Sequence, residues 1–236
     1  MAGFLFKLFK MELNKLFDRE YMLLSLIDNI VQNQSFKIRK EQIRLKGSYP
    51  FIPINIPAFF ESLIIVRELL YAESTNGLKF IDYGCGIGIT MLIARKLGFE
   101  ISGIEYDDKI IENSLFSIYE PKNPIIKGDL TDKKLYKNNQ YDVVYYYSPF
   151  EDYMKEVEFE LNAISTVKIG GYIIAPPPGR MVEYLSNYKS EFKWNLNNGD
   201  IEQSKIRAKF FNEMKNFERI KSEHTTYHHS IFKRIK

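Results

Sequence analysis

Apolar residues follow two different spacings along this chain. From Phe4 to Val31, and again from Ala58 to Tyr71, they recur every three or four residues, which is typical of amphipathic helices. Between these stretches, Gly47–Pro57 carries three prolines, which indicate an extended linker because proline prevents a regular helix. We therefore predict an N-terminal helical extension and linker over residues 1–57 and a main domain over residues 58–236.

From Leu78 onward, short apolar runs alternate with helical stretches, and this alternation predicts a parallel sheet with crossover helices. The predicted strands are Leu78–Tyr83, Phe99–Glu105, Pro124–Lys127, Tyr141–Tyr147 and Gly171–Ala175, and the predicted helices are Thr90–Leu97, Lys109–Ser117 and Tyr153–Val167. The tail differs, because Phe217–His224 and Tyr227–Ile235 read as two strands around a short turn with no helix between them. We expect them to form an antiparallel hairpin.

The segment Phe80–Gly88 holds the strongest candidate chemistry. A strand ends in an acid, Asp82, and a loop with the spacing G-x-G-x-G then turns into a helix. Glycines allow the sharp turn and let a ligand approach the backbone N–H groups, which a Cβ would block. The NAD and FAD fingerprint, G-x-G-x-x-G, requires its third glycine where this chain has Ile89, and no Gly-Lys-Ser/Thr is present for a Walker phosphate loop. A carboxylate ahead of the glycines suits a cationic, methionine-derived ligand better than a pyrophosphate.

With these features the chain resembles the class I S-adenosylmethionine-dependent methyltransferases, whose first motif is a hydrophobic strand, an acid and G-x-G-x-G. Later motifs follow in order: Glu105 ends the second predicted strand, Lys127-Gly128-Asp129-Leu130 resembles the third motif, and Tyr141–Phe150 takes the place of the fourth. The resemblance implies that Glu105 binds the ribose hydroxyls and that Asp129 binds the adenine amino group. It covers roughly residues 58–235.

The fold that this resemblance implies is a Rossmann-like α/β three-layer sandwich. Its mostly parallel, seven-stranded sheet would end in the antiparallel hairpin, and helices would precede it at the N-terminus. S-adenosyl-L-methionine is the implied cofactor, and the residues assigned to it are Asp82, Tyr83, Gly84, Cys85, Gly86, Gly88, Glu105, Tyr106, Asp129, Leu130 and Tyr147.

The methyl acceptor is less well defined by the sequence. Related enzymes that act on planar nitrogens often carry Asn/Asp/Ser-Pro-Pro-Tyr/Phe after the fourth strand, whereas this chain has Tyr147-Ser148-Pro149-Phe150. The departure argues against methylation of a nucleobase or a glutamine amide. By the period of two, Tyr145 and Tyr147 share one strand face and Tyr146 lies on the other. We assign Ser148 and Phe150, more weakly, to an acceptor pocket, with packing and a Ser-Pro turn as the alternative.

The composition bears on the cellular compartment, on metal binding and on the distribution of charge. A single cysteine, Cys85, excludes an intrachain disulfide and suits a reducing compartment, so we predict a cytoplasmic protein. We expect no metal site, and we expect the three histidines, His224, His228 and His229, to occupy surface or hairpin positions. Lys and Arg exceed Asp and Glu by nine to five over residues 1–46 and by nine to four over residues 201–236, although the whole chain carries only +3.

The sequence thus predicts transfer of a methyl group from S-adenosyl-L-methionine to an acceptor that is a small molecule or a protein side chain. Two alternatives stay open: a cofactor-binding scaffold without turnover, and an RNA methyltransferase, which the basic ends favour only weakly. The N-terminal helix either packs as a lid or contacts a membrane surface. The oligomeric state is left open.

Overall fold

The structure, a computed structural model, describes residues 54–70, 77–114, 116–117, 122–137, 140–147, 149–150, 152–175, 209, 212–220 and 229–236. The chain divides between Pro57 and Ala58 into two units, and the second unit, Ala58–Lys236, contains every strand of the sheet. The predicted N-terminal extension lies almost wholly outside the described residues. No helix among the described residues is long and apolar enough to cross a membrane.

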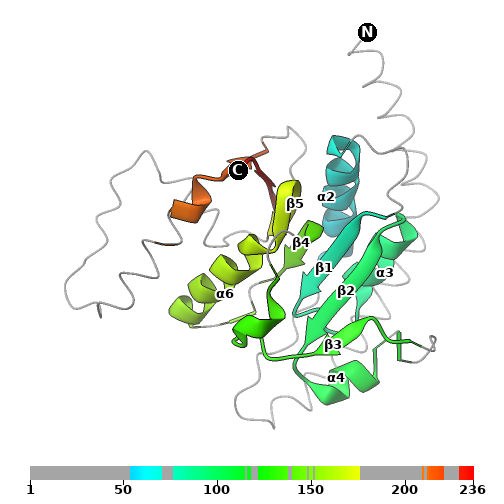
Figure 1. The fold of residues 1–236 in the computed structure, drawn as a ribbon. Helices are drawn as coiled ribbons and strands as arrows, with labels where there is room; N and C mark the ends of the chain where they lie inside the picture. The colour runs from blue at the N-terminus through cyan, green and yellow to red at the C-terminus, as the bar shows by residue number, and fades with distance from the viewer. Residues whose placement is uncertain are drawn as a thin grey trace. The chain divides into compact units, whose positions relative to one another are not determined.

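The described part of the chain forms a seven-stranded sheet between helices (Figure 1). Its elements are α2 (Ile56–Leu69), β1 (Lys79–Tyr83), α3 (Ile89–Lys96), β2 (Glu100–Glu105), α4 (Asp108–Glu112), β3 (Ile125–Lys127), the 3-10 turn η1 (Lys133–Leu135), β4 (Tyr141–Tyr146), α6 (Tyr153–Ser165), β5 (Val167–Ala175), β6 (Phe217–Arg219) and β7 (Ser230–Arg234). The strand order is β3-β2-β1-β4-β5-β7-β6.

The sheet is parallel from β3 to β5 and antiparallel beyond it. β1 pairs with both β2 and β4, so it occupies the centre of the parallel part. β7 runs antiparallel to β5 and to β6, so the tail strands complete the sheet. The predicted α/β fold with a C-terminal antiparallel hairpin is therefore confirmed.

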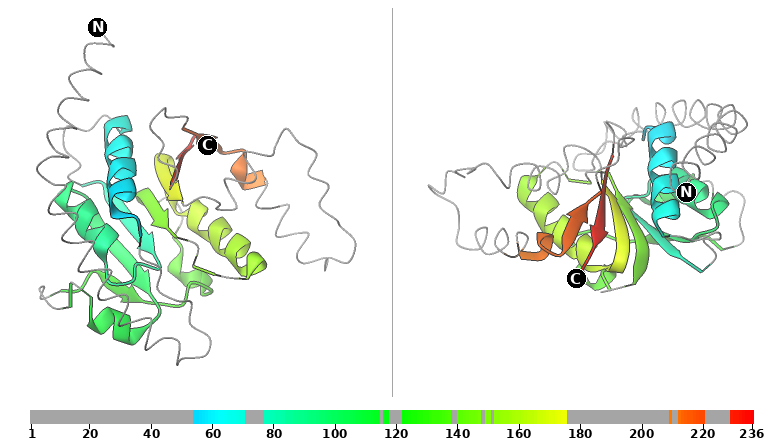
Figure 2. Two further views of the ribbon diagram at one scale, coloured as in Figure 1. Left: turned by 180° about the vertical axis from the view of Figure 1, so that it is seen from behind. Right: turned by 90° about the horizontal axis from the view of Figure 1, so that it is seen from above.

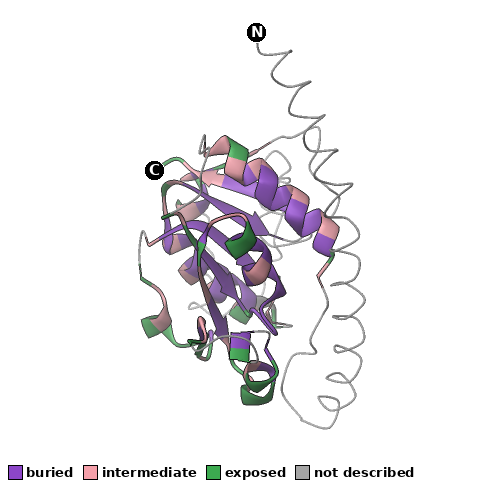
Figure 3. Ribbon diagram, turned by 90° about the vertical axis from the view of Figure 1, so that its right-hand side faces the viewer, coloured by how far each residue is buried: buried purple, intermediate pink, exposed green. Residues whose placement is uncertain are grey.

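The two faces of the sheet are covered by different helices (Figure 2). On one face, Phe59 of α2 contacts the rings of Phe80 and Tyr145, with centroid separations of 6.2 and 4.6 Å. On the other face, Phe159 of α6 packs edge-on against Tyr146, with a centroid separation of 5.2 Å. The central strands are consequently buried nearly throughout (Figure 3). Burial on both faces explains why they read as continuous apolar runs.

The structure corrects several predicted boundaries. β5 begins at Val167, four residues before the predicted strand, and α6 ends at Ser165. The pairing of β4 with β5 shifts register between Tyr141 and Val143, and the extra residues of β5 are accommodated at Gly170, whose φ is +84°. A bulge of this kind disrupts the alternation from which strands are predicted.

The helix boundaries also differ from those predicted. α2 begins at Ile56, so the predicted linker ends earlier, and Pro57 lies in the first turn of the helix, where its missing N–H costs nothing. α4 ends at Glu112, five residues before the predicted Ser117. Apolar spacing alone thus located neither the start of α2 nor the end of α4.

Candidate active site

The carboxyl ends of the parallel strands meet along one edge of the sheet, which is where ligands bind in folds of this kind. Three of the loops that leave this edge contain the predicted site: the glycine loop Gly84–Gly88 after β1, the turn that begins at Tyr106 after β2, and the segment Gly128–Leu130 after β3. The acceptor loop, Tyr147–Phe150, follows β4. Sequence segments up to 66 residues apart, from Gly84 to Phe150, are thus brought to one edge.

The glycine loop has the backbone that its sequence predicted. Gly84, Gly86 and Gly88 have φ values of +81°, +55° and +87°, in the left-handed region that side chains disfavour. The N–H groups of Gly84 and Cys85 donate to the carbonyl oxygen of Ile104 at 2.9 and 3.0 Å, which fixes the loop to β2. Gly88 is the N-cap of α3 and leads directly into the helix.

Asp82 is almost completely buried at the end of β1, with 2% of its surface exposed. The Thr90 hydroxyl, in the first turn of α3, donates a hydrogen bond to its carboxylate. Burial raises the pKa of Asp82 from 3.8 to about 7; the hydrogen bond from Thr90 opposes this shift, and the nearby Glu105 adds to it. Such a carboxyl group titrates near neutrality, and a cation placed beside it would favour its ionised form.

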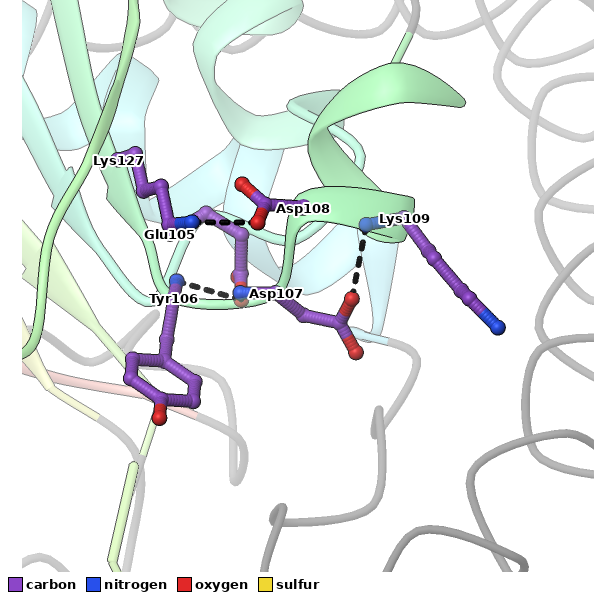
Figure 4. Close-up of polar contacts among 6 residues, drawn as sticks. All are labelled: Glu105, Tyr106, Asp107, Asp108, Lys109 and Lys127. Carbon is purple, nitrogen blue, oxygen red and sulfur yellow. Dashed lines mark hydrogen bonds and ion pairs between the residues drawn. The ribbon is translucent and has the colours of Figure 1, made fainter.

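Glu105 ties the glycine loop to the turn after β2. Its carboxylate accepts hydrogen bonds from the backbone N–H groups of Tyr106 and Asp107 at 2.8 and 3.0 Å (Figure 4). It also accepts one from the N–H of Gly86 at 2.9 Å. Burial raises the pKa of Glu105, whereas these three hydrogen bonds oppose the shift. Because an ionised carboxylate has about four acceptor positions, one remains for a ligand hydroxyl.

The other residues predicted to contact the adenosine portion, Tyr106 and Asp129, follow β2 and β3. The Tyr106 side chain is 63% exposed and projects from the turn after β2, away from the contact between Lys127 and Asp108 (Figure 4). Asp129 is exposed, and its Oδ1 accepts from both the N–H and the hydroxyl of Thr131 at 2.8 Å. Its second carboxylate oxygen has no described bond within this turn, so it can accept from a ligand amino group.

Leu130 and Pro149 border the space beside Gly84. A Cβ built on Gly84 would lie 3.7 Å from the Cβ of Pro149 and 4.0 Å from the Cδ1 of Leu130. The acceptor loop and the segment after β3 therefore both approach the first glycine of the glycine loop. This proximity places the predicted cofactor and acceptor regions next to each other.

The structure does not bring every predicted side chain to the site. The Tyr83 side chain points away from the carboxyl edge into the core, where its hydroxyl donates to Thr166 Oγ1 at 3.2 Å. Only the backbone of Tyr83 therefore lies at the loop. Cys85 is buried in the glycine loop, and burial raises the pKa of its thiol, which disfavours the reactive thiolate. Ser148 lies outside the described residues.

In the acceptor loop, Tyr147 is 38% exposed at the edge of the sheet, which is compatible with contact to a ligand. Phe150 instead packs its ring against Phe159, with a centroid separation of 5.8 Å, so its ring belongs to the core under α6. Tyr145 and Tyr146 lie on opposite faces, as predicted: the Tyr145 hydroxyl is 3.4 Å from Nε2 of His229, and the Tyr146 hydroxyl bonds Glu160. His229 directly precedes β7 and is buried, so the hairpin position is right but a surface position is wrong.

Two residues at this edge are not indicated by any sequence motif. Thr90 has no motif of its own, although its position eight residues after Asp82, in the first helical turn, is a signal that could have been used. Glu156 accepts a hydrogen bond from the backbone N–H of Phe150, which no sequence pattern indicates. Both act through contacts that depend on the packing of a helix against the sheet.

The strand order, the acid at the end of β1 and the glycine turn define a class of protein: a Rossmann-like α/β domain, a fold in which ligands bind at the carboxyl edge of the sheet. Residues 81–175 match the family model described as "Methyltransferase domain". This match agrees with the methyltransferase predicted from the sequence, for which the predicted cofactor is S-adenosyl-L-methionine.

Individual relatives match this chain over a short region or at low sequence identity. A ribosomal protein L11 methyltransferase from Janthinobacterium sp. (strain Marseille) is 43% identical over 54 residues, which are 22% of this chain and 17% of that protein. The chain thus spans less than a fifth of that relative. A putative S-adenosyl-L-methionine-dependent methyltransferase from Methanococcus maripaludis is 15% identical, with a TM-score of 0.47 over 76% of this chain and 86% of its own. An S-adenosylmethionine-dependent methyltransferase from Mesorhizobium loti is 18% identical, with a TM-score of 0.38 over 49% and 52% of the two chains.

Proposed function

We propose that this protein transfers a methyl group from S-adenosyl-L-methionine to a nucleophilic atom of a small molecule or a protein side chain. The observation that carries the proposal is the meeting of Asp82, Glu105 and the glycine loop at the carboxyl edge, with Pro149 of the acceptor loop beside Gly84. The match of residues 81–175 to a methyltransferase domain supports it.

The residues at the edge fit this cofactor. Asp82 would face the cationic methionine portion, Glu105 the ribose hydroxyls, and Asp129 with Tyr106 the adenine. At Gly84 the absence of a side chain keeps the space between Pro149 and Leu130 open, which a Cβ would narrow. When bound, the cofactor supplies a methyl group on a positively charged sulfur, already activated for displacement.

The charge of this edge favours a cation. Asp82, Glu105, Asp107 and Asp129 all lie on the loops or strand ends around it, and Glu105 and Asp107 each raise the pKa of a neighbouring acid. Such a cluster attracts positive ligands and repels phosphates. It therefore supports a sulfonium cofactor over a dinucleotide.

The chain's own contribution to the chemistry is alignment. Methyl transfer to a nucleophile forms one bond as another breaks in line, so holding both partners in a near-attack geometry provides much of the acceleration. Glu105 fixes the cofactor loop by accepting the N–H of Gly86, and Pro149 of the acceptor loop lies near Gly84 of the same loop. Tyr147, exposed at the edge, is placed to contact the acceptor or the methyl-bearing end of the cofactor.

Cofactor binding is tested first by titration calorimetry with S-adenosyl-L-methionine and with its demethylated product. We expect Asp82→Ala to weaken binding of S-adenosyl-L-methionine about tenfold or more, as loss of a buried ionic contact does. Asp142→Ala is the matched control, because Asp142 is also a largely buried acid of the central sheet but bonds Lys168 at the opposite edge. Equal loss in both variants, or no binding by the wild type, contradicts the proposal.

Turnover is tested with methyl-labelled cofactor and a cell lysate separated into protein, small-molecule and RNA fractions. Label in the protein or small-molecule fraction supports the proposed function. Label in RNA only, with salt-sensitive RNA binding, would support the RNA methyltransferase alternative. Cofactor binding without label in any fraction would identify a scaffold. The acidic edge favours the first of these outcomes.

The predicted contact of the N-terminal helix with a membrane surface, and the predicted cytoplasmic location, remain proposals. Residues 1–53 lie outside the described part of the chain. Flotation of the full chain with anionic vesicles, compared with a variant in which Lys7 and Lys10 are replaced by Glu, distinguishes membrane contact from a lid role.

A further inference from the structure

Helix α6 turns two carboxyl groups toward the protein interior. Glu156 and Glu160 are one helical turn apart, and only 4% and 0% of their surfaces are exposed. Burying a carboxylate costs free energy unless hydrogen bonds or charges compensate it. Packing alone therefore does not explain why α6 carries two such groups on its inward face.

The two carboxyl groups serve different partners near the end of β4. Oε1 of Glu160 accepts from the hydroxyl of Tyr146 at 2.9 Å, which is a contact to a side chain of the strand itself. Oε2 of Glu156 accepts from the backbone N–H of Phe150 at 3.0 Å, which lies in the acceptor loop. Among the hydrogen bonds of the described residues, the bond of Glu156 is thus the one that reaches the backbone of the acceptor loop.

The loop is fixed at three points around this bond. Asp152 caps α6 by accepting the N–H of Lys155 at 2.8 Å, so the helix has a defined start. The Phe150 ring packs on Phe159, one turn beyond Glu156. The preceding residue, Pro149, lies near Gly84 of the glycine loop: a Cβ built on Gly84 would be 3.7 Å from the Cβ of Pro149. A displacement of the Phe150 amide would therefore move the contact with Gly84.

We propose that Glu156 is a positioning residue that sets the acceptor loop against the cofactor loop by holding the Phe150 amide. The proposal rests on the proposed methyl transfer. Misplacement of reacting groups by about 1 Å can lower a rate by about a hundredfold. A carboxylate bonded to a backbone N–H is a strong and directional way to prevent this, because the acceptor is charged.

The test compares Glu156→Met with Glu160→Met, a matched pair that removes a buried carboxyl from the same face of α6. The readouts are exchange of the Phe150 amide hydrogen, affinity for S-adenosyl-L-homocysteine, and methyl transfer at saturating labelled cofactor into the lysate fraction that wild-type protein labels. For Glu156→Met we expect faster amide exchange and transfer reduced by about tenfold or more, with cofactor affinity within about threefold of wild type. Glu160→Met should change none of these by more than about threefold.

Two further variants keep the test decisive if Glu156→Met does not fold. Glu156→Asp keeps the charge but shortens the side chain, so it should lose transfer, whereas Glu156→Gln keeps a carbonyl acceptor at the same reach and should restore most of it. Equal transfer by folded Glu156→Asp and wild type, or equal losses in the two Met variants, would overturn the proposal. Wild-type protein that binds cofactor but labels nothing would instead count against the proposed function, and the amide-exchange result would still decide whether Glu156 holds the loop.

Discussion

At the scale of single residues, the chemistry of the site depends on how an acid is buried. Asp82 has its carboxylate enclosed at the end of β1, with Thr90 as its hydrogen-bond donor and Glu105 close enough to raise its pKa further. Without a cation beside it, the neutral acid and the carboxylate have similar free energies near pH 7. A cationic ligand therefore selects the ionised form, and binding releases a proton below that pH.

Affinity for S-adenosyl-L-methionine should consequently rise with pH and level off above about 7. Between pH 5.5 and 7.5 we expect an increase of about twentyfold, in proportion to the ionised fraction of a group whose pKa is about 7. Calorimetry in buffers of equal ionic strength measures this. Asp82→Asn should bind more weakly and show a flat profile, and an unchanged slope in that variant would assign the titration to another group.

The same group affects stability with the opposite dependence on pH. Because the folded pKa of Asp82 lies above its unfolded value of 3.8, its contribution is fully present below pH 3.8 and is lost as pH rises to about 7. Three pKa units correspond to roughly 4 kcal/mol as an upper bound. Urea unfolding without ligand should thus show Asp82→Asn to be more stable than wild type at pH 8, with the difference vanishing toward pH 4.

Gly88 is a glycine at which a side chain would meet both backbone strain and a close neighbour. Its φ of +87° disfavours any L residue, and a Cβ would lie 2.5 Å from Cε2 of Phe116. We expect Gly88→Ala to lower the free energy of unfolding by about 2–4 kcal/mol, from strain and overpacking together. Gly77→Ala is the control: its φ is +84° but no atom lies within 4 Å of its Cβ, so about 1 kcal/mol is expected. Equal losses in urea melts would show that the contact with Phe116 yields easily.

At the scale of secondary-structure elements, the tail strands belong to the core and do not form an appendage. β7 pairs with β5 along Tyr172–Ala175, and Phe232 is fully buried in the cluster beneath α6 together with Ile173 and Phe159. Its neighbour in sequence, Ile231, faces the α2 side and is also buried. β7 thus contributes buried side chains to both faces of the sheet.

Truncation of the tail core should therefore be severe. We expect Phe232→Ala to destabilise the protein by about 3–5 kcal/mol, the range for removal of a buried aromatic ring. Ile235→Ala, three residues later and 46% exposed, should change stability by less than about 1 kcal/mol. Thermal and urea unfolding measure both variants. Similar small effects would mean that β7 opens independently of the sheet.

At the scale of the whole molecule, the fold determines where the unevenly distributed charges of the chain lie. Residues 47–200 hold fifteen Lys and Arg against twenty-one Asp and Glu, although the total charge is +3. The fold gathers several of these acids at the carboxyl edge, where Asp82, Glu105 and Asp129 end or follow three neighbouring strands. A net acidic edge attracts a cationic ligand over distances that salt screens.

Salt should therefore weaken binding of S-adenosyl-L-methionine more than binding of its demethylated product, which lacks the sulfonium charge. Raising sodium chloride from about 0.05 to about 0.5 M shortens the screening length roughly threefold, and we expect a loss of a few-fold for the charged ligand only. Calorimetry with both ligands tests this. Equal sensitivity would mean that contacts within the pocket, and not the field of the edge, select the cation.

Much of this molecule could be predicted from local sequence because local constraints determine it. The alternation of short apolar runs with helical stretches predicted the parallel sheet, since strands buried on both faces must be apolar. The glycines at 84, 86 and 88 were identifiable because only glycine adopts their φ values without strain. The acid at Asp82 was identifiable because it ends a hydrophobic strand directly before them.

What the sequence could not specify depends on which elements pack together. The bulge that starts β5 at Val167 and the burial of His229 next to Tyr145 follow from pairing between strands distant in sequence. The bonds from Thr90 to Asp82 and from Phe150 to Glu156 exist only because α3 and α6 are seated against the sheet. Sequence spacing fixes the backbone turn and the order of the motifs, whereas the environment of each carboxyl group is set by burial, and burial is a property of the packed sheet.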